Sequence, residues 1–496
     1  MDQYKGSDVD KYRCFMSGEG EKNTTWKLGK PPNFDVVNKL FEEGRTKIWP
    51  PGSLEEQVQN LLKTWEMELI HKLNPKDYKS IDATKVSSSV NGMKPLTPEE
   101  VAKIGGGYNM FLQTSLPKQL RLYNPDEETV DSSNKIFTTT FPRGFVIEVL
   151  HVYSGPPVIA FKFRHWGYME GPYKGHPPTG EVVEMFGVCT MEMDEHFKII
   201  KVEFFYDKGE FLASLTKGAR STAAEDSITD RGSSGDHMMF YEQVNPVAMD
   251  QYKGSDVDKY RCFMSGEGEK NTTWKLGKPP NYDVVNKLFE EGRTKIWPTG
   301  SLEEQVQNFV KTWEMEKFHK VNPKDHKTVD VTKSTVSVNG RTPLTTEGVA
   351  KIGGGYNMFL QTSLPQQLGL YNPNDENVDS AHKIFTTTFP RGFAMEILQV
   401  YSGPPLLVYK FRHWGYMEGP FKGHPPTGEM VEMFGISTMQ LDEQLKVVKV
   451  EFFFDRGELL AGLIKGASAT AGGDSITDGG SSSCPFLDDD FRLLDK

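Results

Sequence analysis

An internal repeat constrains this chain more than any other feature. Sliding the 496-residue sequence by 248 positions, half its length, aligns MDQYKGSDVDKYRCFMSGEGEKNTTWKLGKPPN at Met1 with the same string at Met249. The match continues without a gap to DSIT at Asp226 and Asp474. The chain is therefore a tandem duplication. Each unit is too long for a solenoid repeat and long enough to bury a core of its own.

The overall charge restricts the classes of partner. The chain has 68 acidic and 57 basic residues and a formal net charge of -11. It therefore offers no broad basic field for a phosphate backbone or an anionic membrane. No stretch approaches the roughly 20 apolar residues that span a bilayer. The start, MDQYKGSDVDKYR, lacks the apolar segment of a signal peptide. We expect a cytoplasmic protein that binds neither nucleic acid nor membrane.

The cysteines point to reduced thiols. Cys14 and Cys262 are equivalent in the two units, whereas Cys189 and Cys484 have no cysteine counterpart. A disulfide framework would need matching pairs in both units. No CxxC motif suggests zinc. The sets His165, His176, Glu184 and His413, His424, Glu432 lack the spacing of a metal site, so we expect no metal and no cofactor.

Composition divides the chain into five segments. We expect a polar extension over residues 1–30 and a first domain over 31–218. A flexible linker over 219–278 joins a Gly/Ser-rich tail to the second polar extension. The second domain then covers 279–466, and a flexible acidic Gly/Ser tail covers 467–496.

The ordered part of each unit begins with helices. Asp35 is expected to cap a first helix, and Ser53 with Glu56 forms a capping box for a second helix that ends near Asn74-Pro75. Apolar residues at helical spacing predict one buried face on the second helix: Val58, Leu61, Leu62, Trp65 and Leu69.

A third helix is expected after Thr97. Thr97 and Glu100 make another capping box, and the second unit has Gly348 at the position of the glutamate. The start of the helix in the second unit should therefore fray more easily.

From Lys135 the pattern predicts strands. IFTTTF, FVIEVLHVY, VIAFKFRHW, EVVEMFGVCTMEM and FKIIKVEFFY run between Pro/Gly corners, and a short helix, GEFLASLTKG, follows. Connections this short predict antiparallel pairing. Phe161, Phe163 and His165 should face the helices, with Lys162 and Arg164 on the opposite face. The inward face of the last strand stays open. The order predicts an α+β fold.

Several motifs resemble a known family. The loop GPYKGHPPTGEVVEMFG and the ending KIIKVEFFYDKGEFLASL resemble SnoaL-like members of the nuclear-transport-factor-2-like superfamily. YNMFLQTSLP, RHWGYMEGPYKGHPPTGE and the polar extension resemble the plant pathogen-related proteins. The resemblance covers about residues 1 to 230 and 249 to 478. It implies two tandem cones, each a curved antiparallel sheet wrapped around N-terminal helices with a pocket at its open end.

The resemblance also implies functions. Enzymatic members are cofactor-independent cyclases or isomerases that use a pocket Asp or His as acid or base. Other members bind ligands or associate through the sheet, and the pathogen-related group implies a role in plant defence. Asp207 and Asp455 match the family's Asp before the last helix. Met169 and Met417 stand where enzymatic members often carry a His, and methionine cannot transfer a proton.

Each candidate residue also has a structural interpretation. His165 and His413 are either acid/base groups or buried, hydrogen-bonded histidines. Asp207 and Asp455 are either pocket carboxylates or helix N-caps, and the cap is favoured. Glu203 and Glu451 are either buried carboxylates with raised pKa or solvent-facing strand residues, and solvent exposure is favoured. A further set of residues either lines an aromatic pocket or packs in the core: Trp166, Tyr108, Phe163, Met169, Trp414, Tyr356, Phe411 and Met417.

Three hypotheses follow. The first is a non-catalytic, defence-associated protein whose two cones bind a small hydrophobic ligand or a protein partner. The second is a SnoaL-type cyclase or isomerase that uses Asp207 or His165. The third is a scaffold in which the two sheets pack on each other as a pseudo-dimer, or associate with another copy as a homo-oligomer. The repeated loop GHPPTGE is interpreted as a rigid corner beside the site.

Overall fold

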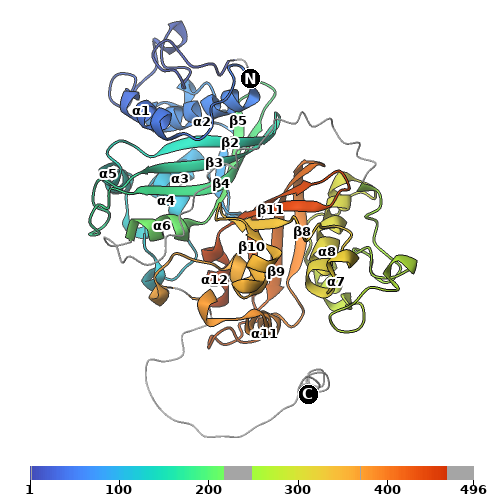
Figure 1. The fold of residues 1–496 in the computed structure, drawn as a ribbon. Helices are drawn as coiled ribbons and strands as arrows, with labels where there is room; N and C mark the ends of the chain where they lie inside the picture. The colour runs from blue at the N-terminus through green and yellow to red at the C-terminus, as the bar shows by residue number, and fades with distance from the viewer. Residues whose placement is uncertain (2, 217–248, 369, 466–496) are drawn as a thin grey trace, which may run out of the picture.

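The computed structural model contains two α+β units, each with its own sheet, and describes residues 1, 3–216, 249–368 and 370–465 (Figure 1). The sheet of the first unit has the order β1-β5-β4-β3-β2, and that of the second has the order β7-β6-β11-β10-β9-β8. The α+β fold class expected from the sequence is confirmed. Each unit is a cone-type domain in which a sheet curves around helices.

The elements of the first unit are α1 (Asp35–Gly44), α2 (Leu54–His71), β1 (Ser87–Val90), α3 (Pro98–Lys103), α4 (Gly107–Leu112), α5 (Val130–Thr140), β2 (Val146–Ser154), β3 (Val158–Tyr168), β4 (Val182–Met193), β5 (Ile199–Tyr206) and α6 (Lys208–Thr216). Those of the second unit are α7 (Asp283–Gly292), α8 (Leu302–His319), β6 (Thr335–Val338), β7 (Leu344–Thr345), α9 (Thr346–Lys351), α10 (Gly354–Phe359), α11 (Val378–Thr388), β8 (Ala394–Ser402), β9 (Leu406–Tyr416), β10 (Met430–Leu441), β11 (Val447–Phe454) and α12 (Arg456–Leu463).

The four long strands of each sheet pair antiparallel, as predicted. The short strand β1 was not predicted, and it pairs parallel to β5. Parallel pairing is possible because more than a hundred residues separate the two strands, enough chain to cross over. The sequence of β1, SSSV, lacks the apolar alternation that would have marked it as a strand.

The long helix α2 supplies the apolar layer beneath the first sheet. Ser53 accepts a hydrogen bond from the Glu56 backbone N–H at 3.2 Å and caps the helix as predicted. Glu56 binds the Gly52 N–H in place of the Ser53 N–H, so the capping box is only half formed. The predicted apolar face is buried against strand residues such as Phe161 and Phe163. The helix ends at His71, before Asn74-Pro75.

Two predictions for the first unit were wrong. Asp35 does not cap α1, because it is the first helical residue and its N–H binds Asn33 Oδ1 at 2.7 Å. The stretch IFTTTF lies in helix α5 and not in a strand. The hydroxyl of Thr140 donates to the Ile136 carbonyl at 2.9 Å, and Thr129 caps the helix, so local hydrogen bonds override the β-propensity of the threonines.

The polar extensions pack on the cores. Tyr4 and Cys14 are buried in the main cluster of the first unit, and Tyr252 and Cys262 occupy the same places in the second. The flexibility expected for residues 249–278 of the linker is therefore wrong, because a few aromatic and sulfur side chains anchor each polar segment. The remainder of the linker, from 219 to 248, and the tail over 467–496 lie outside the described residues.

The two sheets contact each other across the unit boundary (Figure 1). One apolar cluster contains residues of both units: Leu150, Phe186, Val188 and Phe205 of the first, and Val408, Ile436 and Phe453 of the second. Ion pairs flank this cluster. Lys162 binds Glu451 at 2.9 Å, and Lys410 binds Glu203 at 2.7 Å. The packing is therefore reciprocal, as in an isologous dimer.

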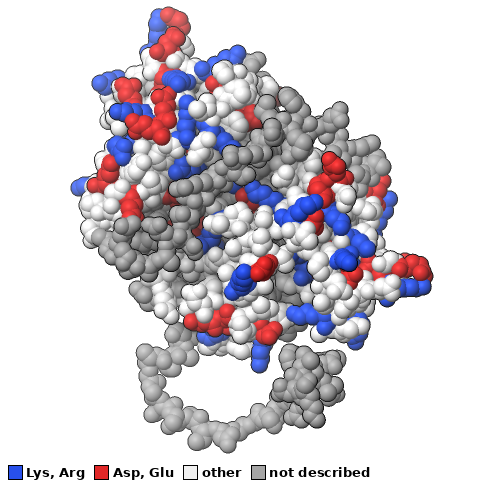
Figure 2. Space-filling view, viewed as in Figure 1, with Lys and Arg blue, Asp and Glu red and all other residues white. Residues whose placement is uncertain are grey.

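The outer surface carries mixed charge. On the face shown in Figure 2, basic and acidic side chains are interspersed over both units. Within the described ranges, no helix is both long and apolar enough to cross a membrane. Cys14, Cys189 and Cys262 are buried and free of disulfides.

Candidate ligand cavity

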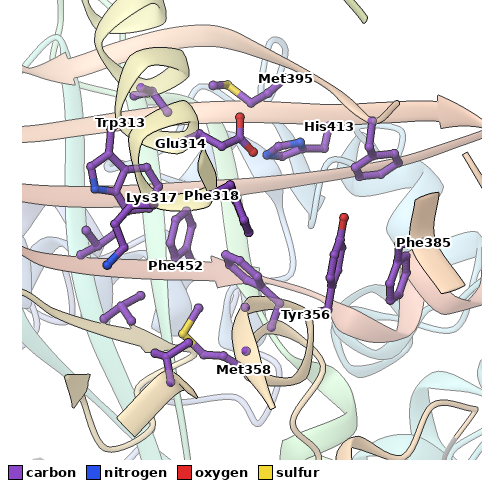
Figure 3. A pocket seen from close by; sticks show the side chains of 18 of the residues that line it. Trp313, Glu314, Lys317, Phe318, Tyr356, Met358, Phe385, Met395, His413 and Phe452 are labelled. Carbon is purple, nitrogen blue, oxygen red and sulfur yellow. The ribbon is translucent and has the colours of Figure 1, made fainter. Parts of the chain in front are cut away.

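The second unit contains a cavity of about 490 Å³ between α8, α10 and the sheet (Figure 3). Most of its lining side chains are apolar, and they include Trp313, Met358, Phe385, Met395, Phe452 and Phe454. This volume lies in the range of small-molecule sites.

The lining residues follow the helical spacing of α8 and the two-residue alternation of β9. Val310, Trp313, Glu314 and Lys317 follow the spacing of one helix face on α8. On β9, every second residue points to the same side of the sheet, and so Tyr409, Phe411 and His413 line the cavity together.

Glu314 is the polar group that the sequence interpretation missed. Its carboxyl points into the cavity toward the ring of His413 (Figure 3). Within the described part of the chain it has no hydrogen bond or ion pair. Burial raises the pKa of Glu314, against the lowering effect of Arg261 and Lys311. The signal was present in the sequence, since an acid interrupts the apolar face of α8.

The pKa of His413 is shifted in the opposite direction from that of Glu314. Burial lowers its pKa to about 4, so the imidazole is neutral at neutral pH. Its ring stacks on Phe393 with centroids 5.5 Å apart, and among the described residues its Nδ1 has no hydrogen-bond partner. A carboxyl whose pKa is raised and a neutral imidazole that can accept a proton therefore face the same apolar space.

The first unit carries the equivalent pair. Burial raises the pKa of Glu66 and lowers that of His165 to about 3. The ring of His165 stacks on Phe145 with centroids 4.3 Å apart. His165 faces the helices, as the strand alternation predicted.

The aspartates after the last strands lie at the boundary between the units. Asp207 Oδ1 accepts the backbone N–H of Gly209 at 2.8 Å, and Asp455 does the same for Gly457 at 2.8 Å. Both therefore cap their own helices. Arg456 lies 3.8 Å from Asp207, and neither aspartate lines the cavity.

The interpretation of Glu203 and Glu451 as solvent-facing was wrong. Their exposed fractions are 5% and 9%, and each binds a lysine of the other unit. These lysines lower the pKa of both glutamates against the effect of burial. A single unit considered by itself could not reveal this, because the face opposite the helices becomes buried only when the second sheet packs on it.

The expected aromatic set is divided between the cavity and the core. Tyr356 and Phe411 line the cavity. Trp414 instead packs beneath α7, where a Cβ on Gly292 would lie 2.5 Å from its indole nitrogen, and Met417 is in a separate apolar cluster. In the first unit, the equivalents are distributed over three apolar clusters. Phe163 is in the main cluster and Trp166 in a second one, while Met169 belongs to a third, against which the partly buried Tyr108 packs.

The loop GHPPTGE forms a corner next to Met169. The Gly180 N–H donates to the Met169 carbonyl at 2.9 Å, and the Met169 N–H donates to the Glu181 carbonyl at 3.0 Å. His176 exchanges backbone hydrogen bonds with Tyr173. In the described ranges no group of three or more His, Cys, Asp or Glu side chains is arranged to hold a metal ion.

The fold and the cavity define a class of protein: a tandem pair of cone domains with an apolar site. Comparison with curated proteins finds a "Pathogen-related protein" of Hordeum vulgare, 60% identical over 226 residues, which cover 45% of this chain and 96% of the relative. The chain belongs to the pathogen-related protein family. The barley relative corresponds in length to about one unit. No family model matches the chain.

The solved structures that match the chain are much more distant. A protein of Jannaschia sp. CCS1 described as a SnoaL-like polyketide cyclase is 16% identical, with coverage of 25% of this chain and 66% of that one and a TM-score of 0.16. IdmH of Streptomyces antibioticus, described as a polyketide cyclase, is 13% identical, with coverage of 29% and 86% and a TM-score of 0.19. A ketosteroid isomerase-like protein of Catenulispora acidiphila in complex with trimethylamine is 8% identical, with coverage of 32% and 91% and a TM-score of 0.19. Likeness at this level carries no functional argument.

Proposed function

We propose that this protein binds a small, mainly apolar molecule in the cavity of its second unit, as part of a plant defence response. The observation that carries the proposal is the cavity itself, with apolar walls and few polar groups, among them Glu314 and His413. Few polar groups in an apolar cavity are typical of sites that fix the orientation of a ligand. The name of the barley relative supports the link to defence.

A neutral apolar dye tests the proposal. N-phenyl-1-naphthylamine should bind the full chain saturably, with a rise in fluorescence. Met433→Trp places a larger side chain in the cavity and should abolish this binding. Met430→Trp makes the same change on the same strand at a residue that is 36% exposed and outside the cavity lining, and it should bind like the parent protein. Equal binding by both variants would refute the assignment of the cavity.

A second candidate function is acid/base catalysis on an enolisable ketone. The observation in its favour is the pairing of a raised pKa at Glu314 with a lowered pKa at His413. His413 would take a proton from the carbon next to the carbonyl, while Glu314 would donate its proton to the carbonyl oxygen. An enol results, and the reverse transfer returns both protons.

Solvent exchange measures this reaction. NMR of 2-decalone in D₂O should show deuterium entering next to the carbonyl, and Glu314→Gln should slow that exchange by about 100-fold. The rate should also fall as pH rises, because Glu314 loses the proton it must donate. Glu347→Gln, an exposed glutamate of α9, is the control. An unchanged exchange rate in Glu314→Gln would leave binding as the function.

A further inference from the structure

We infer that the cavity of the second unit selects an apolar carboxylate, whose anionic end is bound by Lys317 at the mouth. This inference rests on the proposed binding function and names the class of its ligand. It arises from a difference between the two units: Lys317 lines the cavity, whereas Leu69 stands at the equivalent position of the first unit.

Lys317 has no anionic partner in the described part of the chain. Its ammonium donates to the hydroxyl of Thr346 at 3.1 Å, and no carboxylate lies within ion-pair distance. Partial burial of the side chain lowers its pKa, because the charged form has lost part of its hydration. A bound anion would restore the missing electrostatic interaction.

Two acidic residues close to this site do not pair with Lys317. Glu314 is three residues earlier on the same helix, but its carboxyl points toward His413 while the ammonium of Lys317 points to the other end of the cavity (Figure 3). Glu347 lies next to Thr346 and pairs with Lys351 at 2.8 Å. The cation at the mouth is therefore available to a ligand.

A second substitution accompanies the lysine. Thr346, which orients Lys317, occupies the position of Pro98 in the first unit, and proline has no hydroxyl. The second unit thus has both the cation and the group that holds it, and the first unit has neither. Lys275 adds another cation to the lining of the same cavity.

The two polar ends specify the shape of the ligand. Between Lys317 and the Glu314–His413 pair, the walls are apolar and include Trp313, Met358 and Phe452 (Figure 3). A matching molecule has a carboxylate at one end and an apolar body. A hydroxyl or carbonyl at its far end could exchange hydrogen bonds with the carboxyl of Glu314 or the neutral His413.

Calorimetry with matched probes tests the inference on the full chain. Decanoate should bind at least about tenfold more tightly than methyl decanoate, because only the acid can form a charged hydrogen bond with Lys317. Lys317→Leu, which introduces the residue of the first unit, should remove this preference without abolishing ester binding. Lys317→Arg should retain the preference. Lys324→Leu removes an exposed lysine outside the cavity lining and should have no effect.

The outcomes separate the two proposals. Equal affinity for acid and ester in the parent protein, or a preference that survives Lys317→Leu, would overturn the carboxylate assignment while the cavity remains a binding site. If the acid, the ester and N-phenyl-1-naphthylamine all fail to bind, the proposed function fails and the inference fails with it.

Discussion

The boundary between the units and the cavity of the second unit differ in how far equivalent residues of the two units have diverged. At the boundary, equivalent residues retain their charge: Lys162 and Lys410 each bind a glutamate of the other unit, and Lys208 and Arg456 each approach the aspartate that caps the other unit's last helix. In the cavity, Glu314 and His413 keep the equivalents Glu66 and His165, but other positions differ in character. Lys317 stands against Leu69, and Tyr409 against Phe161.

Reciprocal packing explains the difference. Each boundary residue faces a residue of the other unit, so a charge change in one unit leaves a buried partner unpaired in the other. A cavity residue contacts its own unit alone, and its replacement affects one site only. The boundary therefore limits divergence, and the cavity is where the second unit can diverge from the first.

The largest expected effect comes from breaking the boundary. Lys208 has a side chain that is 5% exposed, and its ammonium lies 3.0 Å from both Asp455 and Glu458. Lys208→Met should lower the free energy of unfolding by about 3–5 kcal/mol, because two acids of the other unit lose their cation. Urea denaturation measures this. As a control, Lys39→Met removes a lysine whose side chain is 78% exposed. This variant should change the free energy of unfolding by less than about 0.5 kcal/mol.

A small effect of Lys208→Met would contradict reciprocal packing. If the two variants lost similar stability, Asp455 and Glu458 would have to be hydrated in solution, and the units would not be held together as described. A double variant tests the interaction directly. If Lys208 and Asp455 interact, adding Asp455→Asn to Lys208→Met should recover part of the lost free energy of unfolding.

The sequence predicted the parts of the fold that depend on local pattern. The repeat, the α2 stripe and the four long strands were recognisable because each has a clear period. The pattern failed at two segments, one decided by local hydrogen bonds and one by a tertiary contact. IFTTTF has strand-like residues but forms a capped helix, and the serine-rich β1 becomes a strand only because β5 lies beside it.

The candidate site was only partly predictable. Alternation along VIAFKFRHW predicted that Phe163 and His165 face the helices, and their equivalents Phe411 and His413 line the cavity. Glu314 was not predicted, although it interrupts the apolar face of α8. The boundary role of Asp207 could not be derived from one unit, since the other unit supplies Arg456.

The smallest expected effect concerns helix caps that differ between the units. In α3, Thr97 and Glu100 form a full capping box, whereas in α9 Thr345 caps the helix without a return bond because residue 348 is glycine. A Cβ on Gly348 would lie 3.4 Å from the Leu344 side chain, an ordinary contact. Gly348→Glu should therefore stabilise α9 by about 1 kcal/mol, through the box and the loss of glycine.

Hydrogen exchange of the α9 amides measures this gain, and Glu100→Gly is the reciprocal change in α3. The loss in α3 should exceed the gain in α9, because Glu100 also pairs with Lys94 at 3.0 Å while Thr342 stands at the position of that lysine in the second unit. If amide exchange is no slower with glutamate than with glycine at positions 100 and 348, the capping box does not stabilise these helices. Equal changes in the two helices would show instead that the exposed Lys94 pair contributes nothing measurable.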